Sequence, residues 1–196
     1  MKNKILSLSI LAAVLAAIFY FLNSTLNLLG YAVSKGIIAL NSNQFIDFIM
    51  QNYRTFSMVF ISILILSSLI IYSSFIWISK KRNSKILLIS SILILLAVFI
   101  TLASSLPFLV HSNLIRAFPI PLAKLESYLG IFFFLFGLSL IFSKLPNKTV
   151  KLLGTLYIIE SIVLLSTLFL PIRLTEFTIA IRITEAFFFA QEKTLP

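Results

Sequence analysis

The sequence predicts an all-α fold, a polytopic integral membrane helix bundle with five transmembrane helices plus amphipathic outer and C-terminal helices. The first observation is composition: 60% of the 196 residues are apolar, 11% are charged, and the mean hydropathy is +1.09. Soluble domains carry about 25% charged residues. The second is a series of uncharged apolar runs, long enough for the roughly 20 residues that a helix needs to cross a bilayer. A chain of this length holds these spans in one domain.

A short basic turn at residues 80–85 sets the orientation of the bundle. It lies between two uncharged runs and carries four cations, and such turns stay on the cytoplasmic side of a membrane. A second basic turn occupies residues 144–151. Nine of the sixteen Lys and Arg residues fall in the three short segments that we expect inside: Lys2, Lys4, Lys80, Lys81, Arg82, Lys85, Lys144, Lys148 and Lys151. We therefore expect a cell-membrane protein with a cytoplasmic N-terminus.

The first span is expected at about residues 5–30. Its apolar run, Ile5–Ser34, is much longer than the 7–15 apolar residues of a signal peptide, so we interpret it as an uncleaved helix. Small residues spaced four apart let helix backbones approach closely in lipid. We expect such a contact face, for partner membrane helices, at Ala12, Ala13, Ala16 and Ala17.

The other four spans are expected at about residues 56–79, 86–109, 125–143 and 152–171, with Pro107 stopping or kinking the third. Residues 43–54 form an amphipathic outer segment, with polar side chains at helical spacing. Two interpretations fit this segment equally: a helix at the outer membrane interface, and a lid packed on the bundle.

The C-terminal segment, residues 174–190, has a polar stripe at Thr175, Thr178, Arg182 and Glu185, in which Arg182 and Glu185 are one helical turn apart. The favoured interpretation is an amphipathic helix at the outer surface. The alternative is a short sixth span whose polar face turns into the bundle, which would return the C-terminus to the cytoplasm.

Glu160 is the one ionisable residue deep inside an expected span. A charge there costs about 2.5–3.5 kcal/mol on insertion scales, so Glu160 should face the bundle, protonated or paired. Arg182 on an inserted sixth span is the first candidate for its cation. A structural hydrogen bond and a role in proton or ligand binding both remain open. The candidate intramembrane polar site comprises Glu160, Tyr157, Ser161, Tyr20, Asn23 and Asn27.

A second group of polar residues is expected at the outer ends of the helices. Its candidates are His111, Arg116, Glu126 and Arg173. One interpretation is ordinary solvated charge at the membrane interface. The other is a rim that binds anions or lipid headgroups.

Recognisable catalytic motifs are missing from the sequence. It has no cysteine and one histidine, which excludes thiolate chemistry and sites with two histidines. Phosphate-binding loops and a nucleophile elbow are also missing. We therefore expect no enzyme, cofactor or metal, and we interpret the net charge of +10 as a topology signal rather than a sign of nucleic-acid binding. The expected function is a non-catalytic accessory or scaffolding subunit, or a small stand-alone bundle, with the lipid bilayer as its surroundings. The alternative is a binding or transport subunit with Glu160 in a membrane-embedded polar pocket.

Overall fold

The computed structural model describes residues 2–37, 44–110, 122–166 and 175–195, and the regular secondary structure in these ranges is entirely helical. The prediction of an all-α helix bundle is confirmed. The helices are α1 (Lys2–Ser34), α2 (Gln44–Gln51), α3 (Tyr53–Lys81), α4 (Lys85–Val110), α5 (Leu122–Phe142), α6 (Thr149–Ser166) and α7 (Thr175–Thr194).

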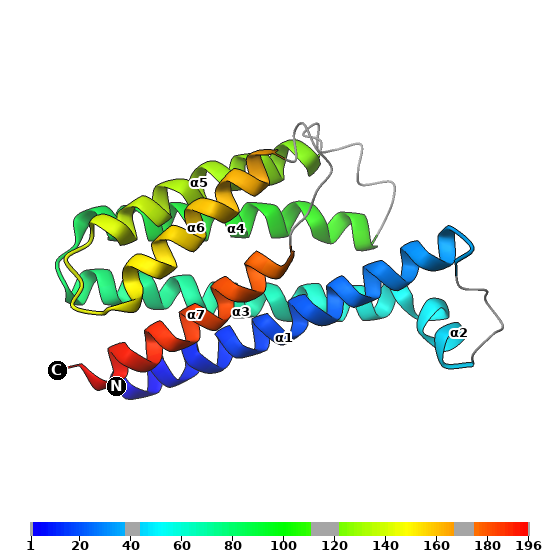
Figure 1. Ribbon diagram of the computed structural model, residues 1–196, viewed down its shortest axis with the longest axis horizontal. Coiled ribbons are helices and arrows are strands. Elements are labelled where there is room, and N and C mark those ends of the chain that lie inside the picture. The colour runs from blue at the N-terminus through cyan, green and yellow to red at the C-terminus, as the bar shows by residue number, and fades with distance from the viewer. Residues whose placement is uncertain (1, 38–43, 111–121, 167–174, 196) are drawn as a thin grey trace.

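The six long helices pack as a closed ring. Each of α3, α4, α5 and α6 contacts the next, α7 packs on α6 and on α1, and α1 completes the ring on α3. Both chain ends and both basic turns lie at one end of the bundle, and α2 lies at the other (Figure 1). We call the first of these the basic end.

Three helices in the described part of the chain are long and apolar enough to cross a membrane. They are residues Asn3–Ser34 of α1, the whole of α3, and the whole of α6. Shorter apolar stretches occupy Lys85–Ile100 of α4 and Leu129–Phe142 of α5. The count of five spans is therefore not confirmed.

Helix α7 lies in a different place from the outer-surface position favoured by the sequence. It packs lengthwise against α1 and α6 and ends at the basic end, where Lys193 Nζ donates a hydrogen bond of 2.9 Å to Ser7 Oγ. The physical reason lies in its two faces. Arg182 and Glu185 find partners inside the bundle, while Ile183 and Phe187 are 46% and 62% exposed.

The first basic turn is tight because a residue with positive φ ends α3. Asn83 has φ of 53°, a conformation that asparagine tolerates better than most residues. The Ser84 N–H then bonds to the Ser79 carbonyl, and the Asn83 N–H to the Lys80 carbonyl. This is the Schellman arrangement, which satisfies the last carbonyls of a helix within about three residues. The chain therefore reverses at once into α4.

Pro107 does not stop α4, which continues to Val110. Neighbouring groups in a bundle can satisfy the backbone carbonyl that proline leaves free, so an interior proline is tolerated.

The position of helix α2 agrees with only one of its two interpretations. It contacts α3 and buries none of its residues, which does not match a packed lid.

Helices α5 and α6 cross with their backbones in direct contact. A Cβ added to Gly137 would lie 2.7 Å from the Gly154 carbonyl oxygen, and one added to Gly154 would lie 2.7 Å from the Gly137 carbonyl oxygen. Since real Cβ atoms do not approach oxygen this closely, only glycine fits either position without a shift of the helices. The pair fixes where α5 and α6 cross.

The alanine face of α1 is buried within the chain itself. Ala12, Ala13, Ala16 and Ala17 are all buried, in a helix whose neighbours are α7 and α3. Their small side chains allow close approach of the helices, as the sequence predicts, but the helices they meet belong to the same bundle.

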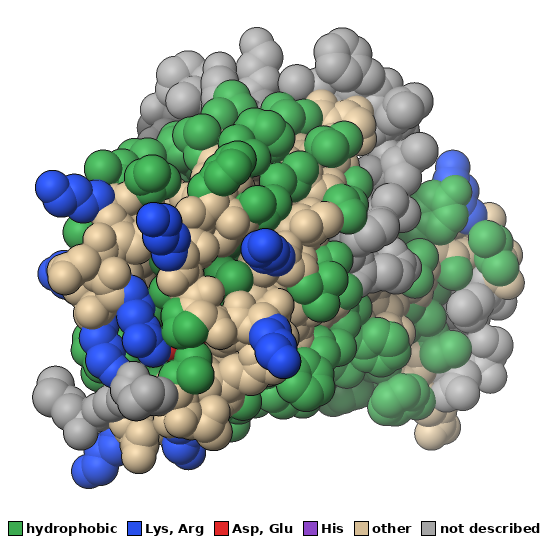
Figure 2. Space-filling view, turned by 60° about the vertical axis from the view of Figure 1, so that its left-hand side comes forward, with side chains coloured by type: hydrophobic (Ala, Val, Ile, Leu, Met, Phe, Trp, Pro, Cys, Tyr) green, Lys and Arg blue, Asp and Glu red, His purple; other side chains and the backbone are tan. Residues whose placement is uncertain are grey.

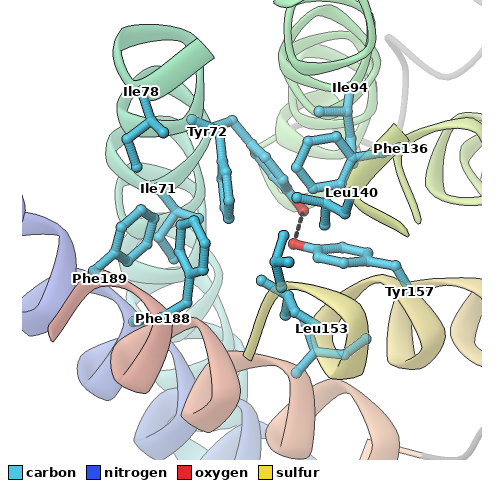
Figure 3. Close-up of a cluster of buried hydrophobic side chains, with 14 of the residues drawn as sticks. Ile71, Tyr72, Ile78, Ile94, Phe136, Leu140, Leu153, Tyr157, Phe188 and Phe189 are labelled. Carbon is cyan, nitrogen blue, oxygen red and sulfur yellow. Dashed lines mark hydrogen bonds between the residues drawn. The ribbon is translucent and has the colours of Figure 1, made fainter. Parts of the chain in front are cut away.

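Aromatic side chains fill the centre of the ring (Figure 3). Phe75 of α3 contacts Phe136 of α5 edge to face at 5.1 Å between ring centroids, and it stacks on Phe188 of α7 at 5.2 Å. Phe136 also meets Tyr157 of α6 edge to face at 4.9 Å. Such pairs add about 0.5–1.5 kcal/mol each beyond burial of their area. The bundle is therefore solid at this level, with α7 as part of its core.

Ala13→Leu should lower the stability of the bundle, because three added carbons must fit between α1 and its neighbours. Overpacking of this kind costs about 1–3 kcal/mol. Val14→Leu is the matched control, since Val14 is the adjacent residue and is exposed. Thermal unfolding in detergent measures the difference. An Ala13→Leu variant with unchanged stability but an altered oligomeric state would show that this face serves a separate partner helix.

Candidate functional site

The most unusual feature of the bundle is a set of charged side chains buried in it. Arg182 and Glu185 of α7 and Glu160 of α6 are 3%, 0% and 7% exposed. Burying a charge is costly unless it is paired and hydrogen-bonded. The partners of these three residues therefore define the candidate site, which we call the buried polar network.

Arg182 is held by one carboxylate and two aromatic rings. Its Nη1 lies 2.8 Å from Glu185 Oε2, one turn along the same helix. Its guanidinium carbon lies 5.7 Å from the ring centroids of both Tyr20 of α1 and Tyr72 of α3. A cation near the face of an aromatic ring gains about 2 kcal/mol or more when it is desolvated. Three helices, α1, α3 and α7, thus meet at one side chain.

Glu185 connects this cation to α6. Its Oε1 accepts a hydrogen bond from the hydroxyl of Tyr157, so both carboxylate oxygens have partners. The Tyr157 hydroxyl also lies 3.3 Å from that of Tyr72 (Figure 3). Because a phenol holds one proton, the consistent arrangement is a chain in which Tyr72 donates to Tyr157 and Tyr157 donates to Glu185. This chain joins α3, α6 and α7.

Glu160 is the less completely satisfied of the two carboxyls. The Thr178 hydroxyl of α7 donates to its Oε1 at 2.5 Å, and Arg182, one turn beyond Thr178, is within electrostatic reach. Among the described residues, Glu160 Oε2 and Arg182 Nε have no hydrogen-bond partner, although both atoms are buried. The expectation that Glu160 faces the bundle agrees with this geometry. Arg182 is the first candidate cation for a charged Glu160, but the ion pair in the structure is with Glu185.

A second set of polar contacts fixes α7 at the basic end. Asn147 lies in the turn before α6, where its Oδ1 accepts the Thr149 N–H at 3.0 Å and its Nδ2 donates to the Phe188 carbonyl at 3.0 Å. Arg82 Nη2 lies 3.5 Å from Glu192 Oε2. The Asn147–Phe188 hydrogen bond and the Arg82–Glu192 ion pair each join α7 to one of the two basic turns.

The residues of the candidate polar site have different surroundings in the structure. Tyr157, Glu160 and Tyr20 all contribute to the buried polar network. Ser161 donates to the carbonyl of Ile158 in its own helix. Asn27 accepts a hydrogen bond of 2.6 Å from the Tyr53 hydroxyl, towards the end of the bundle opposite the basic end. Asn23 Oδ1 is buried and has no hydrogen-bond partner among the described residues.

The candidate outer rim cannot be placed. His111, Arg116 and Arg173 lie outside the described residues, and Glu126 belongs to α5 but its side chain is not described. Within the described ranges, no group of three or more His, Cys, Asp or Glu side chains could hold a metal ion.

Sequence analysis missed two parts of the network. Tyr72 lies in an uncharged run and carried no signal of its own. Glu185 was noticed only as a neighbour of Arg182, whereas its second partner, Tyr157, is 28 positions away. The sequence signal for a helix inside the bundle was the presence of large apolar residues, Ile183 and Phe187, on the side of α7 away from its polar stripe.

Comparison with protein-family models, with curated proteins and with solved structures gives no match.

Arg182→Met should destabilise the bundle strongly, because it leaves Glu185 buried without its cation. Breaking a buried pair from one side costs about 3–5 kcal/mol, whereas replacing both partners by apolar residues is often nearly neutral. The double variant Arg182→Met/Glu185→Leu should therefore lose less stability than Arg182→Met alone, as measured by thermal unfolding. Lys151→Met, which replaces an exposed cation on the neighbouring helix α6, is the control. If Arg182→Met were as stable as this control, the pair would contribute nothing to the packing of α7.

Proposed function

We propose that the chain is a multi-pass membrane protein with six spans, α1 and α3 to α7, and with both termini on the cytoplasmic side. The observation that supports this most is the burial of charged residues on α7, the least apolar of the long helices, beside its buried apolar residues Ile181, Phe188 and Phe189. Its charged residues Arg182 and Glu185 face the bundle, and its residues Ile183 and Phe187 face outwards. A helix in water keeps its charged residues on the solvated face and leaves few large apolar residues exposed.

Buried polar side chains and exposed large apolar side chains also occur on the other long helices. Buried polar side chains include Ser67, Ser74, Ser90, Ser139, Glu160 and Arg182, while large apolar side chains are exposed on the long helices: Leu11, Phe21, Leu66, Ile89, Phe99, Ile131, Leu152 and Phe187. Soluble monomers rarely expose contiguous apolar patches beyond a few hundred Å². Hydroxyl pairs such as Ser9 with Ser74 at 2.5 Å and Ser90 with Ser139 at 2.7 Å join neighbouring helices, as polar residues do inside membranes.

The distribution of charge supports the orientation. Lys and Arg side chains gather over the basic end, and a broad apolar surface begins directly behind them (Figure 2). Placing this end in the cytoplasm follows the positive-inside rule for short loops. It also gives α7 the direction required for a sixth span, since the chain enters α7 from the opposite end.

We propose a non-catalytic role for this bundle, as an accessory or scaffolding subunit or as a stand-alone membrane protein. The carboxyls of the buried polar network are engaged with Arg182, Tyr157 and Thr178, which are neighbours that hold helices together. The six-helix ring is filled by the aromatic cluster at the level of Tyr157, which favours a structural role for the network.

Single cysteines should distinguish six spans from five, and the chain has no native cysteine to react in the background. In intact cells, an impermeant thiol reagent should label Gln51→Cys at the end of α2 and should not label Ser84→Cys in the first basic turn. Thr194→Cys, at the end of α7, should also be protected, and it should react once the membrane is permeabilised. Labelling of Thr194→Cys in intact cells, with Ser84→Cys still protected, would restore the five-span topology.

A second candidate function is binding or transport of a small molecule or a proton. The observation that favours it is the pair of buried atoms without hydrogen-bond partners, Glu160 Oε2 and Arg182 Nε. Buried polar groups nearly always have partners, so such atoms mark positions where a further group can bind. Intramembrane ionisable residues are common at proton and substrate pathways.

Substitutions at Glu160 separate the two candidates. Glu160→Gln keeps the shape of the side chain and an acceptor for Thr178. If the role is structural, Gln should preserve thermal stability, and Ala should lose about 1–3 kcal/mol because a buried partner is left unsatisfied. On the structural hypothesis, the Gln and Ala variants should each restore function to a host that lacks the protein, and the variant with the higher thermal stability should restore more. A Gln variant that folds normally yet fails to complement would favour binding or transport. Thr155→Ala, an exposed change on α6, is the control.

A further inference from the structure

The exposed charge at the basic end has one sign. The described residues there include nine cations, Lys4, Lys80, Lys81, Arg82, Lys85, Lys144, Lys148, Lys151 and Lys193, and a single acid, Glu192. Glu192 is 3% exposed and is paired with Arg82. Lys85, Lys144, Lys148 and Lys151 are exposed, and their ammonium groups have neither an ion pair nor a hydrogen bond within the part of the chain that the structure describes. Glu192 is already paired with Arg82, so it does not neutralise the charge of these four lysines.

These cations lie directly beside exposed apolar side chains. Lys4 and Leu8, and likewise Lys85 and Ile89, are four residues apart and so share a helix face. Lys85 is also followed by Ile86, which is 68% exposed, and Lys151 by Leu152. The positions come from different helices, so the arrangement repeats around the end of the bundle. Figure 2 shows the blue side chains spread across this end, with green surface beside several of them.

A lysine above an exposed apolar residue matches the two chemical parts of one phospholipid molecule. An acyl chain packs on the apolar side chain, and the ammonium group reaches the phosphate by extending along its own apolar stem. Each Lys or Arg near a membrane surface attracts anionic lipid by about 1 kcal/mol, which is about fivefold in affinity. A soluble acidic partner would need the charge but not the apolar neighbours.

We infer that the basic end is a binding ring for anionic phospholipid headgroups, formed by Lys80, Lys85, Lys144, Lys148 and Lys151 together with the adjoining apolar residues. This inference rests on the proposed membrane insertion and goes beyond it. The positive-inside rule explains the side of the membrane on which these cations lie. It does not require that the surrounding lipid be enriched in anionic species.

Trp77 gives an internal reporter for this ring. It is the single tryptophan of the chain, is partly buried in α3, and lies one turn before Lys80. The full chain is reconstituted in phosphatidylcholine and in equal mixtures of phosphatidylcholine and phosphatidylglycerol, with bromine on the acyl chains of one lipid at a time. Quenching of Trp77 fluorescence then measures the binding of each lipid beside α3. Brominated phosphatidylglycerol should quench more strongly than brominated phosphatidylcholine at the same mole fraction.

The double variant Lys80→Gln/Lys85→Gln should reduce the preference for phosphatidylglycerol by about fivefold for each lysine removed. Lys35→Gln, an exposed lysine at the opposite end, should leave the preference unchanged. Equal quenching by the two lipids would overturn the ring while leaving membrane insertion intact. If neither lipid quenched Trp77 beyond its level in detergent, the proposed membrane insertion would itself fail. Loss of the preference on adding soluble polyglutamate, at physiological salt, would assign the surface to an acidic macromolecule instead.

Discussion

The closure of the helix ring depends on the burial of one ion pair. Arg182 and Glu185 are both on α7, but the groups that make their burial tolerable come from other helices: Tyr20 of α1, Tyr72 of α3 and Tyr157 of α6. A buried charge without partners costs several kcal/mol even after relaxation of the surroundings. Helix α7 can therefore occupy its place only when these three tyrosines are correctly positioned. The ion pair thus determines how α7 packs against its neighbours, more than it adds net stability.

The network also explains how a helix as polar as α7 can belong to an apolar bundle. Thr178, Arg182 and Glu185 form a stripe on one face, and each meets a hydrogen-bonding partner inside the ring. At the basic end, Asn147 and Arg82 hold the last turns of the same helix from the two turns of the chain. With most of its buried polar groups paired inside the ring, α7 exposes the apolar side chains of Ile183 and Phe187.

Much of the architecture could be predicted from the sequence, and the exceptions have a common physical cause. Long uncharged runs between basic turns are local signals, so the helices from α1 to α6 and the inward direction of Glu160 could be anticipated. The position of α7 could not, because a polar stripe at helical spacing is the same for a helix lying on a membrane and for one turned inside out. The difference depends on Tyr72 and Tyr157, which are distant in sequence. The alanine face likewise indicated close packing without indicating which helix it meets.

The central claim is that α7 presents Ile183 and Phe187 to lipid while it buries Arg182 and Glu185 in the bundle. Spin labels placed singly at Ile183 and Phe187 in reconstituted protein test it directly, through their collision with oxygen and with a water-soluble nickel complex. The account predicts high accessibility to oxygen and low accessibility to nickel at both positions, with the opposite pattern at Lys193. High accessibility to nickel at Ile183 and Phe187 would contradict it, because α7 would then face water.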